Sequence, residues 1–144
     1  MANILTQITD ELISLIQTNY SRFKDKNRIE LAQEVENENL GYEDCIILDP
    51  QPTDVAIILT SGAIMNYTIN LVYFKKLYDE KINTLSTFAE SLDSYLLGYT
   101  HHSTYWILLT RSIDYNIDEY KPASYEGELG GFIMSLTFTK YKAA

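Results

Sequence analysis

The chain has 144 residues, of which 46% are apolar and 22% charged, a composition typical of a globular protein that excludes a fully disordered one. Eleven Lys and Arg stand against twenty Asp and Glu, and the net charge of −9 opposes general adhesion to nucleic acid or to an anionic membrane. Twelve Tyr provide many rings with a polar tip, which favours an interaction protein. We expect one domain over residues 1–144.

The N-terminal segment predicts an amphipathic helix from Asn3 to about Tyr20. Its apolar residues recur at spacings of three and four: Ile4, Leu5, Ile8, Leu12, Leu15 and Ile16. Because Asp10 and Glu11 interrupt the segment and no basic start precedes it, we expect no signal peptide. No apolar stretch elsewhere has the length of a membrane-spanning helix. We therefore expect the protein to be made and used in the cytoplasm, or assembled there into something larger.

The following segments predict a linker and then two short strands. Residues Ser21 to Glu43 are rich in Lys, Asn and Glu, which is typical of a solvated linker with room for a short helix. Cys45 to Leu48 and Val55 to Thr60 are β-prone runs, and the two prolines between them make a hairpin the economical interpretation. Cys45, the single cysteine, lies in an apolar run and is interpreted as a small buried hydrophobe.

A third strand and a second helix come next. Alternation with a period of two predicts a strand from Ile64 to Phe74 with these residues on its inward side: Tyr67, Ile69, Leu71 and Tyr73. Helical spacing of apolar residues predicts a helix from about Leu85 to Leu97. Asn83 or Thr84 is expected to cap its start, and Gly98 to end it.

Two further strands complete the expected fold. The segment from Tyr105 to Ile117 keeps apolar residues on one parity, and Arg111 is the single charge on that parity, for which a position at the rim is the favoured interpretation. The last strand, Phe132 to Tyr141, is expected to turn four residues inward: Phe132, Met134, Leu136 and Phe138. The loop between these strands, Glu119 to Gly131, is longer than a hairpin needs, and such loops are often functional.

The sequence therefore predicts an α+β fold in the order α-β-β-β-α-β-β. We expect a mainly antiparallel or mixed sheet of about five strands, with the two helices packed on one face. The helices are then expected to leave the other face of the sheet and its edges open.

Catalytic and metal-binding signatures are weak. His101 and His102 are adjacent, so their side chains diverge, and a metal would need carboxylates from elsewhere. The chain has no Gly-x-Ser-x-Gly element, and Cys45 lies far from both His residues in sequence. We expect no enzyme and no metal site.

The remaining candidates for binding chemistry also have simpler interpretations. Gly127-x-x-Gly130-Gly131 precedes a strand and lacks the Lys and Ser/Thr of a nucleotide loop, so it is interpreted as a flexible loop, and no cofactor is expected. Scattered carboxylates are typical of a solvated face: Asp10, Glu11, Glu34, Glu36, Glu38, Asp114, Asp118 and Glu119.

The order of elements resembles the tail-terminator, or tail-completion, proteins of long-tailed bacteriophages and the neck proteins related to them. The match consists of the amphipathic segment Ile4 to Ile16, the strands after it, the helix STFAESLDSYLL, the strand YWILLTRSIDYNI, the long loop and the strand FIMSLTFTKY. The resemblance is one of pattern and size over nearly the whole chain. The family has no short invariant motif, so the resemblance transfers no catalytic or ligand residue.

The resemblance implies a structural virion protein of the tail or neck, assembled in the cytoplasm of a host bacterium. Members of the family form rings, usually hexameric, that cap the completed tail tube and face the head-side connector. The implied partners are copies of the chain, the tail tube and the connector or neck proteins, with no membrane and no sequence-specific nucleic acid. A negative net charge would suit a ring whose channel DNA must pass without sticking.

Residues of the long loop and its approach are the candidates for a subunit interface: Arg111, Tyr120, Tyr125, Glu126 and Glu128. Tyr120 and Tyr125 can equally serve as anchors of the loop within one chain. Two alternatives to the tail-terminator function stay open. One is another neck or head-completion protein, and the other is a small-ligand-binding α+β domain with a pocket lined by Tyr67, Tyr95, Tyr105 and Trp106.

Overall fold

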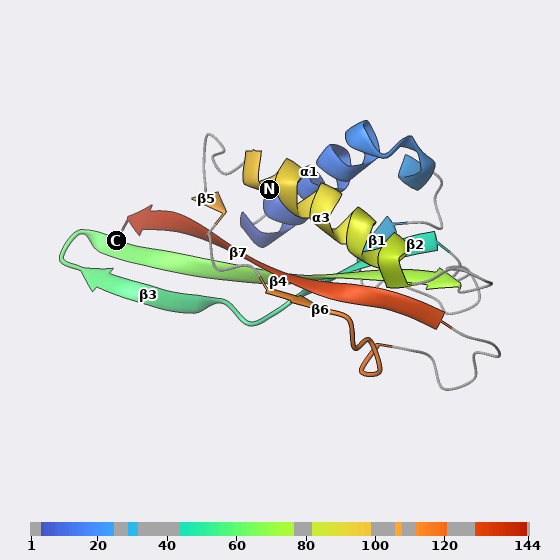
Figure 1. Ribbon diagram of the computed structural model, residues 1–144. Coiled ribbons are helices and arrows are strands. Elements are labelled where there is room, and N and C mark those ends of the chain that lie inside the picture. Colours follow the sequence, from blue (N-terminus) through green and yellow to red (C-terminus); the bar gives the residue numbers. More distant parts are fainter. Residues whose placement is uncertain are drawn as a thin grey trace.

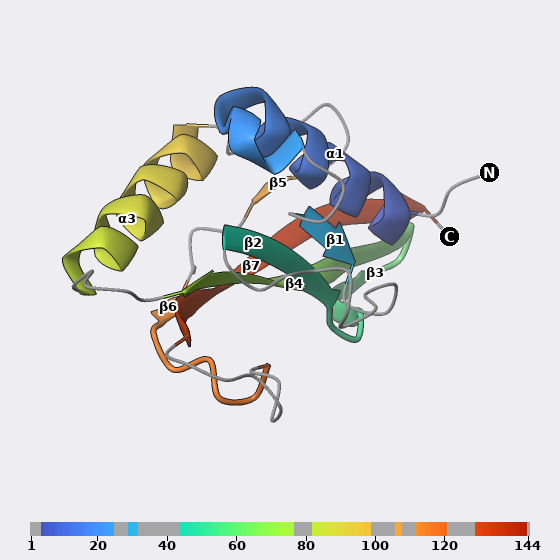
Figure 2. The same ribbon diagram turned by 90° about the vertical axis from the view of Figure 1, so that its right-hand side faces the viewer.

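The computed structural model describes residues 4–24, 29–31, 44–76, 82–98, 106–107, 112–120 and 129–143. Two helices lie on the same side of a long, twisted sheet (Figures 1 and 2). In chain order the elements are α1 (Ile4–Asn19), the 3₁₀ turn η1 (Ser21–Lys24), β1 (Ile29–Leu31), β2 (Asp44–Pro50), β3 (Asp54–Leu59), β4 (Gly62–Lys76), α3 (Ile82–Gly98), β5 (Trp106–Ile107), β6 (Ser112–Asp114) and β7 (Leu129–Ala143). The predicted α+β fold is confirmed.

The sheet is built on a central pair of long strands. β4 and β7 have 15 residues each and pair antiparallel along their whole length. On the outer edge of β4, β2 pairs with residues 69–75 and β3 with residues 62–66. β5 and β6 share the outer edge of β7, and β1 adds to β2 in parallel. The sheet is therefore mixed and mainly antiparallel, as predicted.

The predicted hairpin between the two proline-separated runs is wrong. β2 and β3 both run antiparallel to β4, so the chain does not reverse between them. The Gln51 N–H donates to the Thr68 carbonyl at 2.8 Å and keeps the connection on β4. The prolines interrupt the strand without reversing it. The hairpin that does form joins β3 to β4 through the turn at Thr60 and Ser61.

The face of the sheet beneath the helices carries the main core. All inward positions predicted for β4 and β7 are buried there: Tyr67, Ile69, Leu71, Tyr73, Phe132, Met134, Leu136 and Phe138. The helices meet them with residues three and four positions apart: Ile8, Leu12 and Ile16 from α1, and Leu85, Ala89, Leu92 and Leu96 from α3. Alternation in the strands and helical spacing thus converge on one apolar layer.

The helix boundaries agree with the predicted segments except at one cap. α1 fills the predicted range. α3 begins at Ile82, so Asn83 and Thr84 lie in its first turn and do not precede it. The first turn is ambiguous from sequence because Asn83 and Thr84 can either precede a helix as caps or lie within it, whereas the apolar spacing places the rest of the helix. Gly98 is the last residue of α3.

The segment predicted as a solvated linker contributes to the core in its described parts. Phe23 of η1 has no exposed surface, and Ile29 of β1 is 6% exposed. The Phe23 ring stacks on Phe88 at a centroid distance of 6.0 Å and meets Tyr73 edge-on at 6.3 Å. Isolated apolar residues among polar ones give no periodicity, which is why the sequence concealed these contacts. The rest of Ser21 to Glu43, residues 25–28 and 32–43, falls outside the described residues.

The strand predicted from Tyr105 to Ile117 is shorter than expected. Its described parts pair with β7 at residues 106–107 and 112–114, and residues 115–117 have left the sheet. Asp114 Oδ1 accepts from the Asn116 N–H and Asn116 Oδ1 from the Asp118 N–H, both at 3.0 Å. Such side-chain bonds to the backbone compete with the ladder and end the strand.

One end of the opposite face carries a second apolar cluster. It consists of Cys45, Ile47, Val72, Phe74, Ile117 and Leu129, with Tyr120 and Ile133 packed against it. Figure 2 shows the segment after β6 on the side of the sheet away from both helices. The expectation that this face is left open is therefore wrong at this end. Cys45 is 1% exposed, in agreement with its interpretation as a buried hydrophobe.

Gly131 is required by the close approach of β7 to β4. Gly130 and Gly131 lie within β7, although the sequence placed them in a flexible loop. A Cβ at Gly131 would meet the Tyr73 carbonyl oxygen at 1.8 Å. The glycine lets two backbones approach where a side chain would hold them apart.

Candidate functional site

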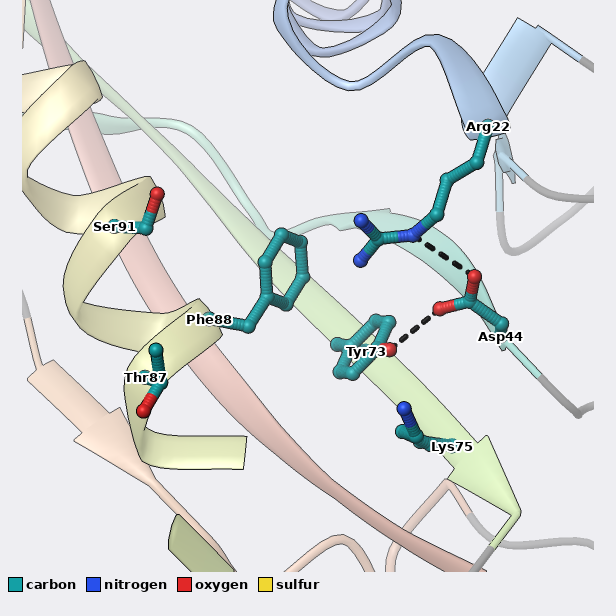
Figure 3. A pocket seen from close by; sticks show the side chains of 7 residues that line it. All are labelled: Arg22, Asp44, Tyr73, Lys75, Thr87, Phe88 and Ser91. Atoms are coloured by element: carbon teal, nitrogen blue, oxygen red, sulfur yellow. Dashed lines mark hydrogen bonds and ion pairs between the residues drawn. The ribbon is translucent and has the colours of Figure 1, made fainter. Parts of the chain in front are cut away.

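A hollow of about 680 Å³ opens between α3 and the sheet. Its walls come from η1, β2, β4 and α3, and Figure 3 shows how the side chains converge. The lining residues are Arg22, Asp44, Tyr73, Lys75, Thr87, Phe88 and Ser91. Phe88 and Tyr73 form an aromatic wall, with ring centroids 4.6 Å apart, and the charged groups stand beside it.

Three polar groups of this hollow, those of Arg22, Asp44 and Tyr73, bind one another. Arg22 Nε lies 2.8 Å from Asp44 Oδ2, and the Tyr73 hydroxyl donates to Asp44 Oδ1 at 2.5 Å. The Arg22 guanidinium also lies against the Phe88 and Phe23 rings, with Cζ 4.7 Å and 4.6 Å from their centroids. Burial, and then the hydrogen bond to Asp44, raise the pKa of Tyr73 well above its usual range.

These contacts are better suited to holding elements of the fold together than to acid–base catalysis. Tyr73 stays a neutral donor, and both Asp44 oxygens already have partners. Close by, the Tyr20 hydroxyl and Ser91 Oγ lie 2.8 Å apart and join the end of α1 to α3. The hollow is thus the place where η1, β2 and α3 are fastened together.

Two of the four rings proposed from sequence for a ligand pocket do not line this hollow. Tyr67 and Tyr95 are absent from its walls, and the side chains of Tyr105 and Trp106 fall outside the described ones. Sequence reasoning missed Arg22 and Asp44 because their partners, Phe88 and Tyr73, lie far along the chain. No local pattern signals such a pairing.

A second polar cluster spans the opposite face of the sheet. Asp49, Asn70, Ser135 and Ser112 stand in register across four strands. Ser135 Oγ donates to Asn70 Oδ1 at 2.8 Å, and Asn70 Nδ2 donates to the Tyr120 hydroxyl at 3.3 Å. That hydroxyl donates to Asp49 Oδ2 at 2.5 Å. Burial and the bond to Asp49 raise the pKa of Tyr120 to about 12.

Tyr120 is the one predicted interface residue within the described part of the chain, and it is half-buried. Its hydroxyl and ring hold the segment after β6 on the sheet, as an anchor would. The other predicted interface residues lie outside the described residues: Arg111, Tyr125, Glu126 and Glu128. The same holds for His101, His102 and Gly127.

The described ranges contain no candidate metal site. No cluster of three or more His, Cys, Asp or Glu side chains comes together there. Three of the scattered carboxylates are exposed. Asp114 is the last residue of β6, and Asp118 and Glu119 lie in the segment after it.

The most unusual surface lies at the other end of the sheet. There β3, the start of β4 and the end of β7 form a ribbon, residues 54–65 and 139–143, that extends past the helices (Figure 1). We call this ribbon the arm. Every side chain of β3 is exposed. The exposed surface of the arm consists mainly of large apolar side chains. On β3, Val55, Ile57, Ile58 and Leu59 are 52%, 51%, 83% and 43% exposed, and on β7 Tyr141 is 47% exposed.

Apolar exposure is concentrated on the arm. Of the six exposed large hydrophobic residues in the described ranges, five lie there, and the sixth is Tyr115. The sequence did carry a signal: the run from Val55 to Leu59 is apolar without alternation, although a strand with one buried face alternates. That run was interpreted as an ordinary strand because sequence reports apolarity and not what covers it.

The chain matches no family model and no curated protein. Within the described residues, no helix combines the length and apolarity needed to cross a bilayer. The class of protein is therefore defined here by fold and surface: a two-helix α+β domain with a mixed sheet and an exposed apolar arm.

Proposed function

We propose that this protein is a structural virion subunit of the tail-terminator type. It joins copies of itself in a ring, hexameric as is usual in the family it resembles, at the head–tail joint of a long-tailed phage. The ring caps the tail tube and faces the connector or neck proteins. The subunit is made in the cytoplasm of a host bacterium, acts in the virion, and needs no catalytic group, cofactor or membrane.

The observation that carries this proposal is the arm. Burying exposed apolar surface stabilises a complex by about 25 cal/mol per Å². A contiguous apolar patch on a folded domain therefore commonly marks a contact with another protein. β3 pairs with β4 on one edge, and its side chains are exposed on both sides of the ribbon. A strand of this kind is suited to adding to a neighbouring sheet or lying in a neighbour's groove.

Further support comes from the order of elements and from the hollow. Helix, strands, helix and the final long strand follow one another as in the family that the sequence resembles. Arg22, Asp44 and Tyr73 of the hollow bind one another, which fits a domain that functions through contact with other proteins. The net charge of −9 suits a ring through which DNA slides.

A binding experiment with tail tubes tests this function. Tail-tube subunits from the same genome are assembled into tubes, mixed with the purified chain and viewed by negative-stain electron microscopy. We expect ring-shaped density at tube ends and tubes that no longer elongate. Tubes that stay uncapped and keep growing would contradict the proposal. Binding to the isolated connector and not to tubes would favour the other neck or head-completion function.

Small-ligand binding is the second candidate, and the size of the hollow favours it. About 680 Å³ falls within the roughly 300–1,000 Å³ common for ligand sites. A ligand there would compete for the Arg22–Asp44 pair. Thermal-shift screening of the chain and of Phe88→Ala decides this candidate: stabilisation by a compound in the first and not in the second would support it.

A further inference from the structure

The charge of the molecule is unevenly distributed. The whole chain carries −9, yet the arm contains one acidic residue, Asp54, and two lysines, Lys140 and Lys142. The negative balance therefore belongs entirely to the rest of the chain. The arm is the basic, apolar part of an acidic protein.

The register places these lysines beside exposed apolar side chains. Lys142 pairs with Ala63, which pairs with Ile58, so the three form one row across the arm. Lys140, Met65 and Val55 form the next such row. Partners in a row point to the same side of a sheet. The most exposed apolar residue of the arm, Ile58, thus shares a surface with two cationic groups.

A complementary surface lies elsewhere on the molecule, along residues 112–120. This segment contains no Lys or Arg, and its three carboxylates, Asp114, Asp118 and Glu119, are all exposed. Tyr115 is 39% exposed in the same segment and supplies an apolar contact. We call residues 112–120 the acidic segment.

The two surfaces cannot meet within one chain. β6 pairs with β7 at residues 133–135, whereas the lysines stand at positions 140 and 142 of the same strand. At roughly 3.3 Å per residue, about 20 Å of strand separates them. Figure 1 shows the tip of the arm and the segment after β6 at opposite ends of the sheet. A contact between them has to join two copies.

We propose that the arm of one copy docks on the acidic segment of the next copy, head to tail. This inference rests on the proposed function and names the subunit contact of the ring. Opposite charges favour this pairing, whereas a symmetric arm-to-arm contact would gather the lysines of both copies, and a segment-to-segment contact would gather carboxylates. A contact between two different surfaces of identical chains generates a closed ring when its rotation closes.

Charge exchange tests the contact. One variant reverses the arm, Lys140→Glu with Lys142→Glu, and a second reverses the segment, Asp118→Lys with Glu119→Lys. All four positions lie at exposed or half-exposed sites, and circular dichroism melts verify that each variant folds. Sedimentation velocity over a concentration series then reports the assembly of each variant, of their equimolar mixture and of the chain with all four substitutions.

We expect the wild-type chain to assemble. Each reversed variant should associate at least about tenfold more weakly than the wild type, because attraction becomes repulsion at the contact. The mixture and the four-substitution chain should recover assembly, since each again joins opposite charges. Zero-length cross-linking of mixed light and heavy-isotope chains should link Lys140 or Lys142 of one copy to Asp118 or Glu119 of another.

Several results would overturn the contact. Reversed variants that assemble like the wild type, a mixture without recovery, or a wild-type chain that stays monomeric and shows no such cross-links would each do so. The first two leave the ring function standing on another contact. Recovered assembly together with uncapped tail tubes would retain the contact and remove the tail-terminator function.

Discussion

Gly131 shows how one missing side chain sets the spacing of the two central strands. Its backbone lies so close to Tyr73 that a Cβ would stand 1.8 Å from a carbonyl oxygen, and a carbonyl in the core cannot swing aside. We expect Gly131→Ala to lower the free energy of unfolding by about 3 kcal/mol or more, as measured by urea denaturation.

Gly62→Ala provides the comparison for this substitution. There the Cβ would meet the Lys142 carbonyl oxygen at 2.1 Å, but at the tip of the arm, where the ribbon can open without disturbing the core. The expected loss is smaller, about 1–2 kcal/mol. Equal losses at the two glycines would contradict the role given to Gly131.

Tyr120 fastens the segment after β6 with one hydroxyl. Tyr120→Phe removes the donor to Asp49 and the acceptor for Asn70, so we expect a loss of about 1–2 kcal/mol of unfolding free energy near pH 7. Ser14→Ala, on the exposed side of α1, serves as the control and should change little.

The pH dependence of this loss follows from the raised pKa. In the folded chain the pKa of Tyr120 is about 12, against an ordinary value of 10.0. Its contribution is therefore complete below pH 10 and declines as the pH rises toward 12. Urea titrations at intervals across this range should show the difference between wild type and Tyr120→Phe shrinking. A difference that grows with pH would refute the assignment.

At the scale of elements, η1 belongs to the core despite its polar neighbours. Phe23 has no exposed surface and packs on Tyr73 and Phe88. We expect Phe23→Ala to cost about 3–5 kcal/mol of unfolding free energy. Arg22→Ala, next to it, should cost about 1 kcal/mol or less, because the Arg22 side chain is 42% exposed and its pair with Asp44 is partly solvated. Chemical denaturation of both variants checks the contrast.

Elements with two distinct faces could be predicted from the sequence. α1, α3, β4 and β7 each carry apolar residues at the period of their own geometry, so both their type and their buried side followed. The pairing of both β2 and β3 with β4 could not be predicted from the sequence. The prolines between them show where the strand is interrupted, but not which strand the next segment pairs with. The end of β6 was missed because Asp114 and Asn116 bond the backbone locally.

The surfaces were harder to predict than the core. Tyr120 was named from sequence as a candidate contact, and its ring and hydroxyl are engaged within the chain. The arm was read as an ordinary strand, because exposure depends on how far the helices reach along the sheet. The Arg22–Asp44 pair joins residues whose proximity only the fold creates.

At the scale of the whole molecule, a well-packed body under two helices continues into an arm whose outer strand, β3, is exposed along its whole length. Large apolar side chains on both sides of a strand contribute little to folding while exposed, so their value lies in association. The molecule thus divides into a folding body and a binding arm.

Substitution of Ile58 tests that division most directly. Ile58 is 83% exposed, so Ile58→Asp should leave the unfolding free energy within about 0.5 kcal/mol of the wild type. Ser94→Asp, exposed on α3, adds the same charge away from the arm and is the matched control. In sedimentation velocity at equal concentrations we predict that Ser94→Asp assembles like the wild type and that Ile58→Asp stays monomeric. Assembly of Ile58→Asp equal to that of Ser94→Asp would contradict the account.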